Sequence, residues 1–202
     1  MKRRVALFAE DNFHERFLRT LLERMAVEAA IEIEIEARSV SGGLPKVVEQ
    51  FEAYVKDLRK QSATMPDLIV VATDSNCVGH TERKRMVVAV AARFPPIERL
   101  LICAIPEPHI ERWMLADPNA FAEVFGRGCT APTVKCKKDE YKHLLVNEIR
   151  KSGIEAPLGG REFAEDIVLK LDLTRVAQNE ASFGLLHSAL RAKFQQWQQQ
   201  RR

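Results

Sequence analysis

The chain of 202 residues has no long hydrophobic run. No stretch approaches the roughly 18 consecutive apolar residues that a membrane-spanning helix needs, which excludes an integral membrane protein. The N-terminus begins with basic residues, but its apolar stretch ends at Ala9, because Glu10 and Asp11 follow. A secretory signal has a longer apolar core, so we expect a cytoplasmic protein.

Cysteine is scarce as well, and its four copies are Cys77, Cys103, Cys129 and Cys136. None forms a CxxC pair, and the spacing of Cys129, Cys136 and His143 matches no familiar zinc site. A chain of this length buries a core without disulfide bonds, so we expect reduced thiols.

Several nucleotide and hydrolase motifs are also missing. The chain contains neither GxGxxG nor GxxxxGK[ST], which leaves no basis for a dinucleotide-binding or P-loop enzyme. It has no nucleophile elbow of the GxSxG type. The net charge of +3 is small, but residues 127–202 hold 14 Lys and Arg against 9 Asp and Glu. A nucleic-acid partner is therefore compatible with the C-terminal part.

Strand and helix patterns alternate along the first half. Apolar strand patterns cover residues 2–9, 31–38, 67–72 and 99–105, and helical patterns begin near Asn12, Pro45 and Thr81. The alternation of isoleucine and glutamate in residues 31–38 predicts a strand near a sheet edge, and the aliphatic run 67–72 predicts a central one. Three crossovers predict a doubly wound, mainly parallel α/β sheet of about four strands flanked by helices.

After Pro106 the strand patterns stop. Helical patterns cover residues 108–125, 137–151, 161–169 and 182–200. We therefore expect an α/β domain at residues 1–126 and a helical C-terminal extension at residues 127–202 that packs on it.

Acidic residues follow two of the predicted strands. Glu10 and Asp11 follow the first, and Asp74 with Asn76 follows the third. The carboxyl ends of parallel strands share one edge of the sheet, where ligands usually bind. Carboxylate oxygens at such an edge suit Mg²⁺ or Mn²⁺. The alternative is that these acids cap helices, which we prefer for Asp11.

The segment Leu7–Phe13 and the turn Asp74–Gly79 together resemble the Toprim domain of topoisomerases, primases and OLD-type nucleases. That family places a glutamate after its first strand and a DxD motif after its third, and these acids hold Mg²⁺ for phosphodiester chemistry. Glu10 and Asp74 match this pattern. Asn76 stands in the place of the second aspartate, where its amide oxygen can coordinate a cation but brings no charge.

The segment Ile110–Asp117, IERWMLAD, is similar to the IExWLLAD signature of a Toprim-related family of small prokaryotic proteins. That family is associated with mobile elements and phage defence. By this resemblance, Glu111 would face the site near Glu10 and Asp74. The alternative is a structural acid on a helix whose Ile110, Trp113 and Met114 pack inward.

Basic residues follow the Asp74–Gly79 turn, at the start of the next predicted helix. Cations at the start of a helix oppose the helix dipole, so Arg83, Lys84 and Arg85 indicate a bound phosphate, unless they form a solvated surface. His80 is either a proton donor or an ordinary turn residue. A second basic patch with one aromatic residue comprises Lys135, Lys137, Lys138, Tyr141 and Lys142.

Three classes of function follow from these motifs. The first is a Toprim-type, Mg²⁺-dependent nuclease or phosphotransfer enzyme. Its catalytic residues would be Glu10, Asp74 and Glu111, its metal ligands Glu10, Asp74 and Asn76, and its substrate-binding residues His80, Arg83, Lys84 and Arg85. The second is a non-catalytic binding or effector module that works with a partner protein of a defence system. Oligomerisation is compatible with both.

The third class is a phosphoacceptor receiver domain, which also binds Mg²⁺ through acids after its first and third strands. Against it, the strand ending at Cys103 and Ala104 lacks the expected Ser or Thr, and no fifth strand ending in Lys follows. The sequence leaves DNA, RNA and nucleotide open as substrates. If the acids surround a cation site, Glu10→Gln and Asp74→Asn should keep or raise the melting temperature, because clustered carboxylates repel one another.

Overall fold

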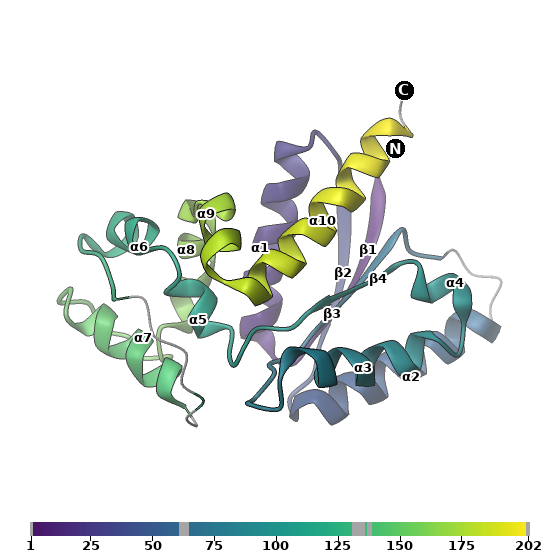
Figure 1. Ribbon diagram of the computed structural model, residues 1–202, viewed down its shortest axis with the longest axis horizontal. Coiled ribbons are helices and arrows are strands. Elements are labelled where there is room, and N and C mark those ends of the chain that lie inside the picture. The colour runs from purple at the N-terminus through teal and green to yellow at the C-terminus, as the bar shows by residue number, and fades with distance from the viewer. Residues whose placement is uncertain (1, 61–64, 131–135, 137–138, 201–202) are drawn as a thin grey trace.

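A computed structural model of the protein describes residues 2–60, 65–130, 136 and 139–200. It shows an α/β fold with one four-stranded, all-parallel sheet in the order β2-β1-β3-β4 (Figure 1). The strands are β1 (Arg3–Ala9), β2 (Ile33–Ser39), β3 (Leu68–Ala72) and β4 (Leu101–Ala104). The predicted fold class is confirmed, with the Ile/Glu strand β2 at an edge and the aliphatic strand β3 inside the sheet.

The strands end in register. Ala9 of β1 pairs with Ser39 of β2 and with Ala72 of β3, and Ala72 pairs with Ala104 of β4. The residues that follow these strand ends therefore leave the sheet at one common edge, which we call the carboxyl edge.

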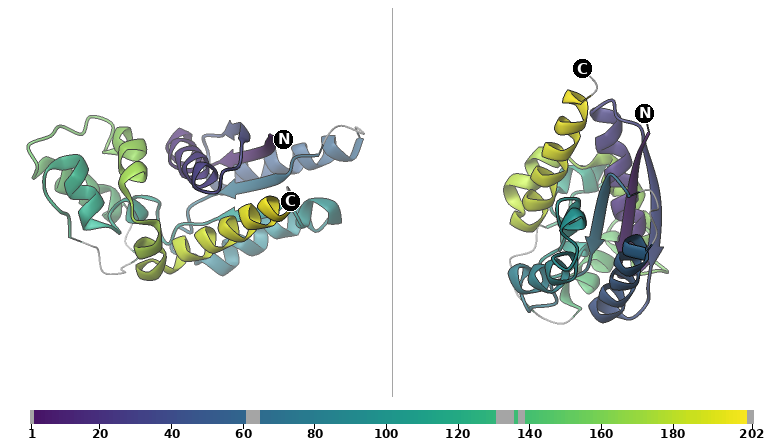
Figure 2. Two further views of the ribbon diagram at one scale, coloured as in Figure 1. Left: turned by 90° about the horizontal axis from the view of Figure 1, so that it is seen from above. Right: turned by 90° about the vertical axis from the view of Figure 1, so that its right-hand side faces the viewer.

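Helices cover both faces of the sheet (Figure 2). On one face, α1 (Asn12–Glu28) and α10 (Ala181–Gln199) pack on strand residues such as Val5, Leu7 and Val70. On the other face, α2 (Gly43–Lys60), α3 (His80–Ala91) and α4 (Pro95–Glu98) pack on Phe8 and Val71. Successive side chains of a strand point to opposite faces of the sheet, so the strands contribute to the core on both faces. This is why their sequences are continuously apolar.

After β4, helices begin at Glu111, within the range 1–126 that we expected for the α/β domain, and continue into residues 127–202. The C-terminal part of the chain is thus helical. It follows β4 through α5 (Glu111–Met114), α6 (Pro118–Phe125), α7 (Glu140–Arg150), the 3-10 helix η1 (Arg161–Phe163), α8 (Ala164–Lys170) and α9 (Leu173–Asn179). These elements gather at the end of the molecule where β4 leads into α5, and α10 then returns along the sheet (Figure 1). One apolar cluster runs from Val5 of β1 through Trp113 to Trp197 of α10, so both parts of the chain share a core.

Some details differ from the sequence expectations. The structure begins α2 at Gly43, two residues before Pro45. It also contains α9, which we did not expect, because Leu173 and Val176 are its only buried residues and give too short a pattern. Lys137 and Lys138, where a helix was expected to begin, lie outside the described residues, and α7 begins at Glu140.

The expectation of four reduced thiols is wrong for one pair. Cys77 and Cys136 form a disulfide, with their Cα atoms 5.6 Å apart. The fold brings the Asp74–Gly79 turn next to residue 136, although 59 residues separate the two cysteines in the chain. Sequence spacing alone carries no information about this approach. Cys103 and Cys129 are free.

Within residues 2–60, 65–130, 136 and 139–200, the structure contains no helix that is both long and apolar enough to cross a membrane.

Candidate active site

Glu10 joins the ends of the two central strands. Its Oε2 accepts hydrogen bonds from the Thr73 hydroxyl at 2.6 Å and from the backbone N–H of Asp74 at 2.9 Å. Since β1 and β3 are hydrogen-bonded neighbours, the residues after them meet at the carboxyl edge. The structure thus brings Glu10 and Asp74 together. It uses Glu10 to fix the position of the Asp74 backbone.

Asp74 lies at the centre of a buried polar network and is only 6% exposed. Its Oδ1 lies 3.0 Å from His14 Nε2 and accepts the Ile110 backbone N–H at 3.0 Å. Its Oδ2 lies 3.0 Å from His109 Nδ1. Burial alone would raise the pKa of Asp74, but the charge of His14 and the hydrogen bond from His109 lower it below its usual range. Asp74 is therefore ionised at neutral pH.

His14 bridges two carboxylates. Its Nε2 faces Asp74, and its Nδ1 lies 2.8 Å from Asp11 Oδ1. A neutral imidazole has only one N–H, so both hydrogen bonds form only when the ring is protonated. Burial opposes this charge, but Asp74 and Asp11 raise the pKa of His14 well above 6.5. His14 therefore supplies a fixed positive charge inside the site.

Asp11 caps α1, as expected from the sequence. Its Oδ1 accepts the backbone N–H of His14 at 2.9 Å. Burial raises the pKa of Asp11, but the hydrogen bond and charge of His14 outweigh this, and the pKa falls to about 2. Asp11 thus has two roles, because it caps the helix and holds the His14 ring.

His109 is a site residue that the sequence analysis missed. It follows β4 and is 5% exposed, and its Nδ1 bonds Asp74. The hydrogen bond to Asp74 raises the pKa of His109, with burial acting in the opposite direction. No hydrogen bond to its Nε2 is found among the described residues. An imidazole held at one nitrogen by a buried carboxylate is the usual arrangement of a proton-transferring histidine.

Glu111 also lies at the carboxyl edge, as the resemblance implied, and is only 2% exposed. Its Oε2 is buried, and no hydrogen-bond partner for it is found among the residues that the structure describes. Burial, followed by the nearby charge of Asp74, raises the pKa of Glu111. Ile110, Trp113 and Met114 beside it are fully buried, so the helix also has the structural role that we gave as the alternative.

Glu111 gives a stability prediction. Its folded pKa is raised, so the folded state loses stability as pH rises from about 4.5 through that pKa. Glu111→Gln removes the buried charge and should raise the melting temperature by a few degrees at about pH 8. The gain should disappear near pH 4, where both states are protonated. Melting curves at the two pH values test this, and a lower melting temperature at pH 8 would show that the ionised carboxylate stabilises the fold.

Asn76 lies on the exposed side of the turn. Its backbone N–H donates to Pro108 O at 3.1 Å, and its φ of 46° is in the left-handed region that asparagine tolerates. No hydrogen bond from its side chain to a described residue is found. The structure therefore does not bring the Asn76 amide into the Asp74 network, and its metal-binding role stays a prediction.

The predicted phosphate-binding residues of α3 are partly committed to other contacts. Arg83 donates its Nε–H to Ser75 O at 3.1 Å, which holds the turn after Asp74. Arg85 forms an exposed ion pair with Glu82 at 2.7 Å. Burial and the charge of Lys84 lower the pKa of His80. No ion pair of Lys84 is found in the described part of the chain.

The second basic patch is only partly described. Lys135, Lys137 and Lys138 lie outside the described residues. Tyr141 is buried, and its ring centroid lies 6.5 Å from that of His109, so Tyr141 packs beside the site and offers no open stacking surface. Lys142 pairs with Asp139 at 3.1 Å, and its charge opposes the rise in the pKa of His109. The helix α7 therefore lies next to the carboxyl edge.

Two carboxylates of the site, Glu10 and Glu111, each have an oxygen for which no hydrogen bond to a described residue is found. Asp74 has both oxygens occupied by hydrogen bonds, and the described residues contain no group of three His, Cys, Asp or Glu side chains placed to hold a metal. Within the same described residues, no hydrogen bond to Glu10 Oε1 or Glu111 Oε2 is found, and Ser75 Oγ, next to Asp74, is also buried without a partner there. Two carboxylates completed by waters and phosphate oxygens are a common Mg²⁺ environment.

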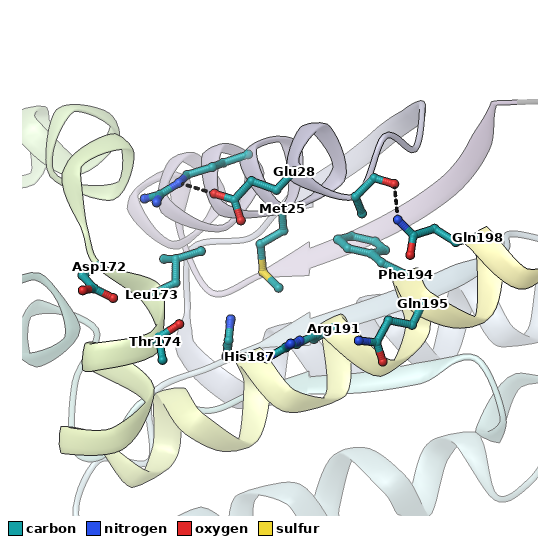
Figure 3. A pocket seen from close by; sticks show the side chains of 12 residues that line it. Met25, Glu28, Asp172, Leu173, Thr174, His187, Arg191, Phe194, Gln195 and Gln198 are labelled. Atoms are coloured by element: carbon teal, nitrogen blue, oxygen red, sulfur yellow. Dashed lines mark hydrogen bonds and ion pairs between the residues drawn. The ribbon is translucent and has the colours of Figure 1, made fainter.

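A separate cavity of about 500 Å³ lies between α1, the start of α9, and α10 (Figure 3). Met25, Leu173 and Phe194 form its apolar part, and His187 and Arg191 project from α10. None of the candidate catalytic residues lines it. This cavity is therefore separate from the acidic residues at the carboxyl edge.

No protein-family model, curated protein or solved structure gives a significant match to this chain.

Proposed function

We propose that the carboxyl edge is the active site of a Toprim-type, Mg²⁺- or Mn²⁺-dependent enzyme that cleaves or transfers phosphodiesters of nucleic acid. One observation carries the proposal. Glu10, Asp74 and Glu111 follow three different strands and converge at one edge of the sheet, and the buried Oε2 of Glu111 has no hydrogen-bond partner among the described residues. Such an oxygen is costly to bury unless a ligand satisfies it.

Glu10 and Glu111 are the proposed ligands of the cation. When bound, the ion would polarise the scissile phosphate and lower the pKa of a coordinated water. Asp74 has a different role in this proposal, because its oxygens are already occupied. It orients His109 through the bond to Nδ1 and holds the His14 charge in place.

His109 is the proposed proton donor. Its raised pKa increases the protonated fraction at neutral pH, and its Nε2, which has no hydrogen bond to a described residue, would donate a proton to the leaving oxygen. His14 stays protonated between Asp11 and Asp74. Its positive charge offsets part of the repulsion that the acidic residues would exert on a phosphate group.

Incubation of the pure protein with plasmid, single-stranded DNA and RNA tests this function. Each substrate is incubated with Mg²⁺, with Mn²⁺ and with a chelator. Cleavage that needs the metal supports the enzyme. Intact substrates in every lane would favour the second class, a non-catalytic Toprim-like module that acts with a partner protein, which the neutral Asn76 also favours. Cytoplasmic location and a role in phage defence remain parts of the proposal.

Asn76 gives a prediction for the same site. If the turn approaches the cation, Asn76→Asp adds a negative charge without changing the shape of the side chain, and aspartate also tolerates the left-handed backbone found there. Binding of Mg²⁺ or Mn²⁺ should tighten by about 1–3 kcal/mol, roughly five- to a hundredfold. Titration calorimetry on both proteins measures this. Equal affinities would show that residue 76 lies away from the cation.

A further inference from the structure

The C-terminal extension delivers a positive charge to the acidic edge. Arg161, the first residue of η1, places its Nη1 3.5 Å from Asp11 Oδ2 and its Nη2 3.8 Å from Glu111 Oε1. Arg161 lies 50 positions after Glu111 in the chain, so the sequence gives no sign that the two side chains approach each other. The fold therefore completes the site with a residue from outside the α/β part.

Both contacts of Arg161 are long. Charge-assisted hydrogen bonds between arginine and carboxylates are usually about 2.7–2.9 Å long. Tight pairs elsewhere in the chain reach this range, such as Arg16 with Glu165 at 2.8 Å. The Arg161 side chain is also 38% exposed. Its guanidinium is thus near the acids but not locked to them, and it faces solvent as well.

Local packing fixes where Arg161 lies. A Cβ atom on Gly160 would lie 2.6 Å from Ile149 Cδ1 of α7, so a larger residue would have to displace the end of that side chain. The φ of Gly160 is 82°, which also favours glycine. The Arg161 guanidinium carbon lies 5.3 Å from the centroid of the buried Phe13 ring, a distance typical of a cation–π contact. The backbone and the ring together hold the guanidinium at the edge.

We propose that Arg161 binds a phosphate of the substrate at the carboxyl edge. This inference rests on the proposed function and adds a residue that fixes the position of the substrate. A guanidinium offers a planar set of N–H donors that fits two phosphate oxygens at once. An incoming phosphate would replace the long contacts to Asp11 and Glu111 with shorter ones. The acidic edge alone would repel the phosphate, and Arg161 reduces that repulsion.

Binding of a labelled single-stranded oligonucleotide tests the proposal. Fluorescence anisotropy is measured at several salt concentrations. Ca²⁺ replaces Mg²⁺, because Ca²⁺ also binds carboxylate oxygens but is not the metal that we propose for the reaction. Arg161→Gln should weaken binding about tenfold or more. The slope of affinity against salt concentration should also become less steep, by the amount expected for the loss of about one phosphate contact. Arg161→Lys should restore part of the affinity, since it keeps the charge but loses the planar donor set.

Arg99→Gln is the matched control, because Arg99 is exposed and precedes β4 at the opposite edge of the sheet. It should keep the affinity and salt slope of the wild type. Wild-type binding by a folded Arg161→Gln variant, with an unchanged salt slope, would overturn the role of Arg161 and leave the proposed function intact. A wild-type protein that binds neither a DNA nor an RNA oligonucleotide would overturn both. If Arg161→Gln fails to fold, Arg161→Ala takes its place, and wild-type affinity with an unchanged salt slope in that folded variant would overturn the role.

Discussion

Replacing His14 with leucine is expected to destabilise the protein by about 3–5 kcal/mol, measured by urea unfolding in metal-free buffer. The ring lies between Asp11 and Asp74, at 2.8 and 3.0 Å, and is 2% exposed. Its loss leaves the buried carboxylate of Asp74 and the partly exposed carboxylate of Asp11 without their shared cation. Removal of one partner of a buried ion pair has this large effect because the remaining charge stays uncompensated.

His143→Leu is the control for the His14 variant, because His143 is exposed on α7. It should change the free energy of unfolding by less than about 0.5 kcal/mol. A double-mutant cycle with Asp74→Leu tests the cause, since the two losses should not add when both charges are absent. If His14→Leu lowers the free energy of unfolding by less than about 1 kcal/mol, the contacts of His14 with Asp11 and Asp74 are no stronger than ordinary surface ion pairs. That result would contradict a buried imidazolium.

The second large effect concerns activity. Glu10→Gln should reduce metal-dependent cleavage by roughly 10²–10⁴-fold, the range typical of a residue that acts on the reacting groups. Glutamine still accepts the hydrogen bonds of Thr73 and Asp74 through its amide oxygen, so the strand ends should stay joined. What is lost is the negative charge that we assign to the cation.

Melting temperature separates these effects for Glu10→Gln. A nearly unchanged melting temperature with lost activity supports a role in chemistry, and full activity would remove Glu10 from the site. Asp74→Asn is a poorer test than the sequence alone implied. The carboxylate of Asp74 is paired with two histidines, so its neutralisation is expected to lower stability instead of leaving it unchanged.

The fold was largely predictable because its elements have clear periodicities. The aliphatic run of β3, the alternating pattern of β2 and the helical spacing of α1 each reflect how those elements are buried. The short helix α9 was missed because two apolar residues do not make a periodic pattern. The Cys77–Cys136 disulfide was missed because it depends on the approach of two segments distant in the chain.

The candidate site was only partly predictable. Glu10 and Asp74 stand out because they lie one and two residues after the ends of strands, and parallel strands end at one edge. His14 did carry a signal, since it lies at helical spacing from Leu18 and Leu21 on the apolar face of α1, and a polar residue there needs buried partners. His109 and Arg161 are in irregular or short segments without periodicity, so only the fold shows where they lie.

The location of a bound cation tests the central claim most directly. Paramagnetic Mn²⁺ added in small amounts to ¹⁵N-labelled protein broadens the amide signals of residues near the ion. We expect selective broadening at residues 10–11, 74–76 and 110–112, around Glu10 and Glu111, and its loss in the Glu10→Gln variant. Broadening confined to the exposed glutamates of β2, Glu34 and Glu36, or no selective broadening at all, would contradict a catalytic metal at the carboxyl edge.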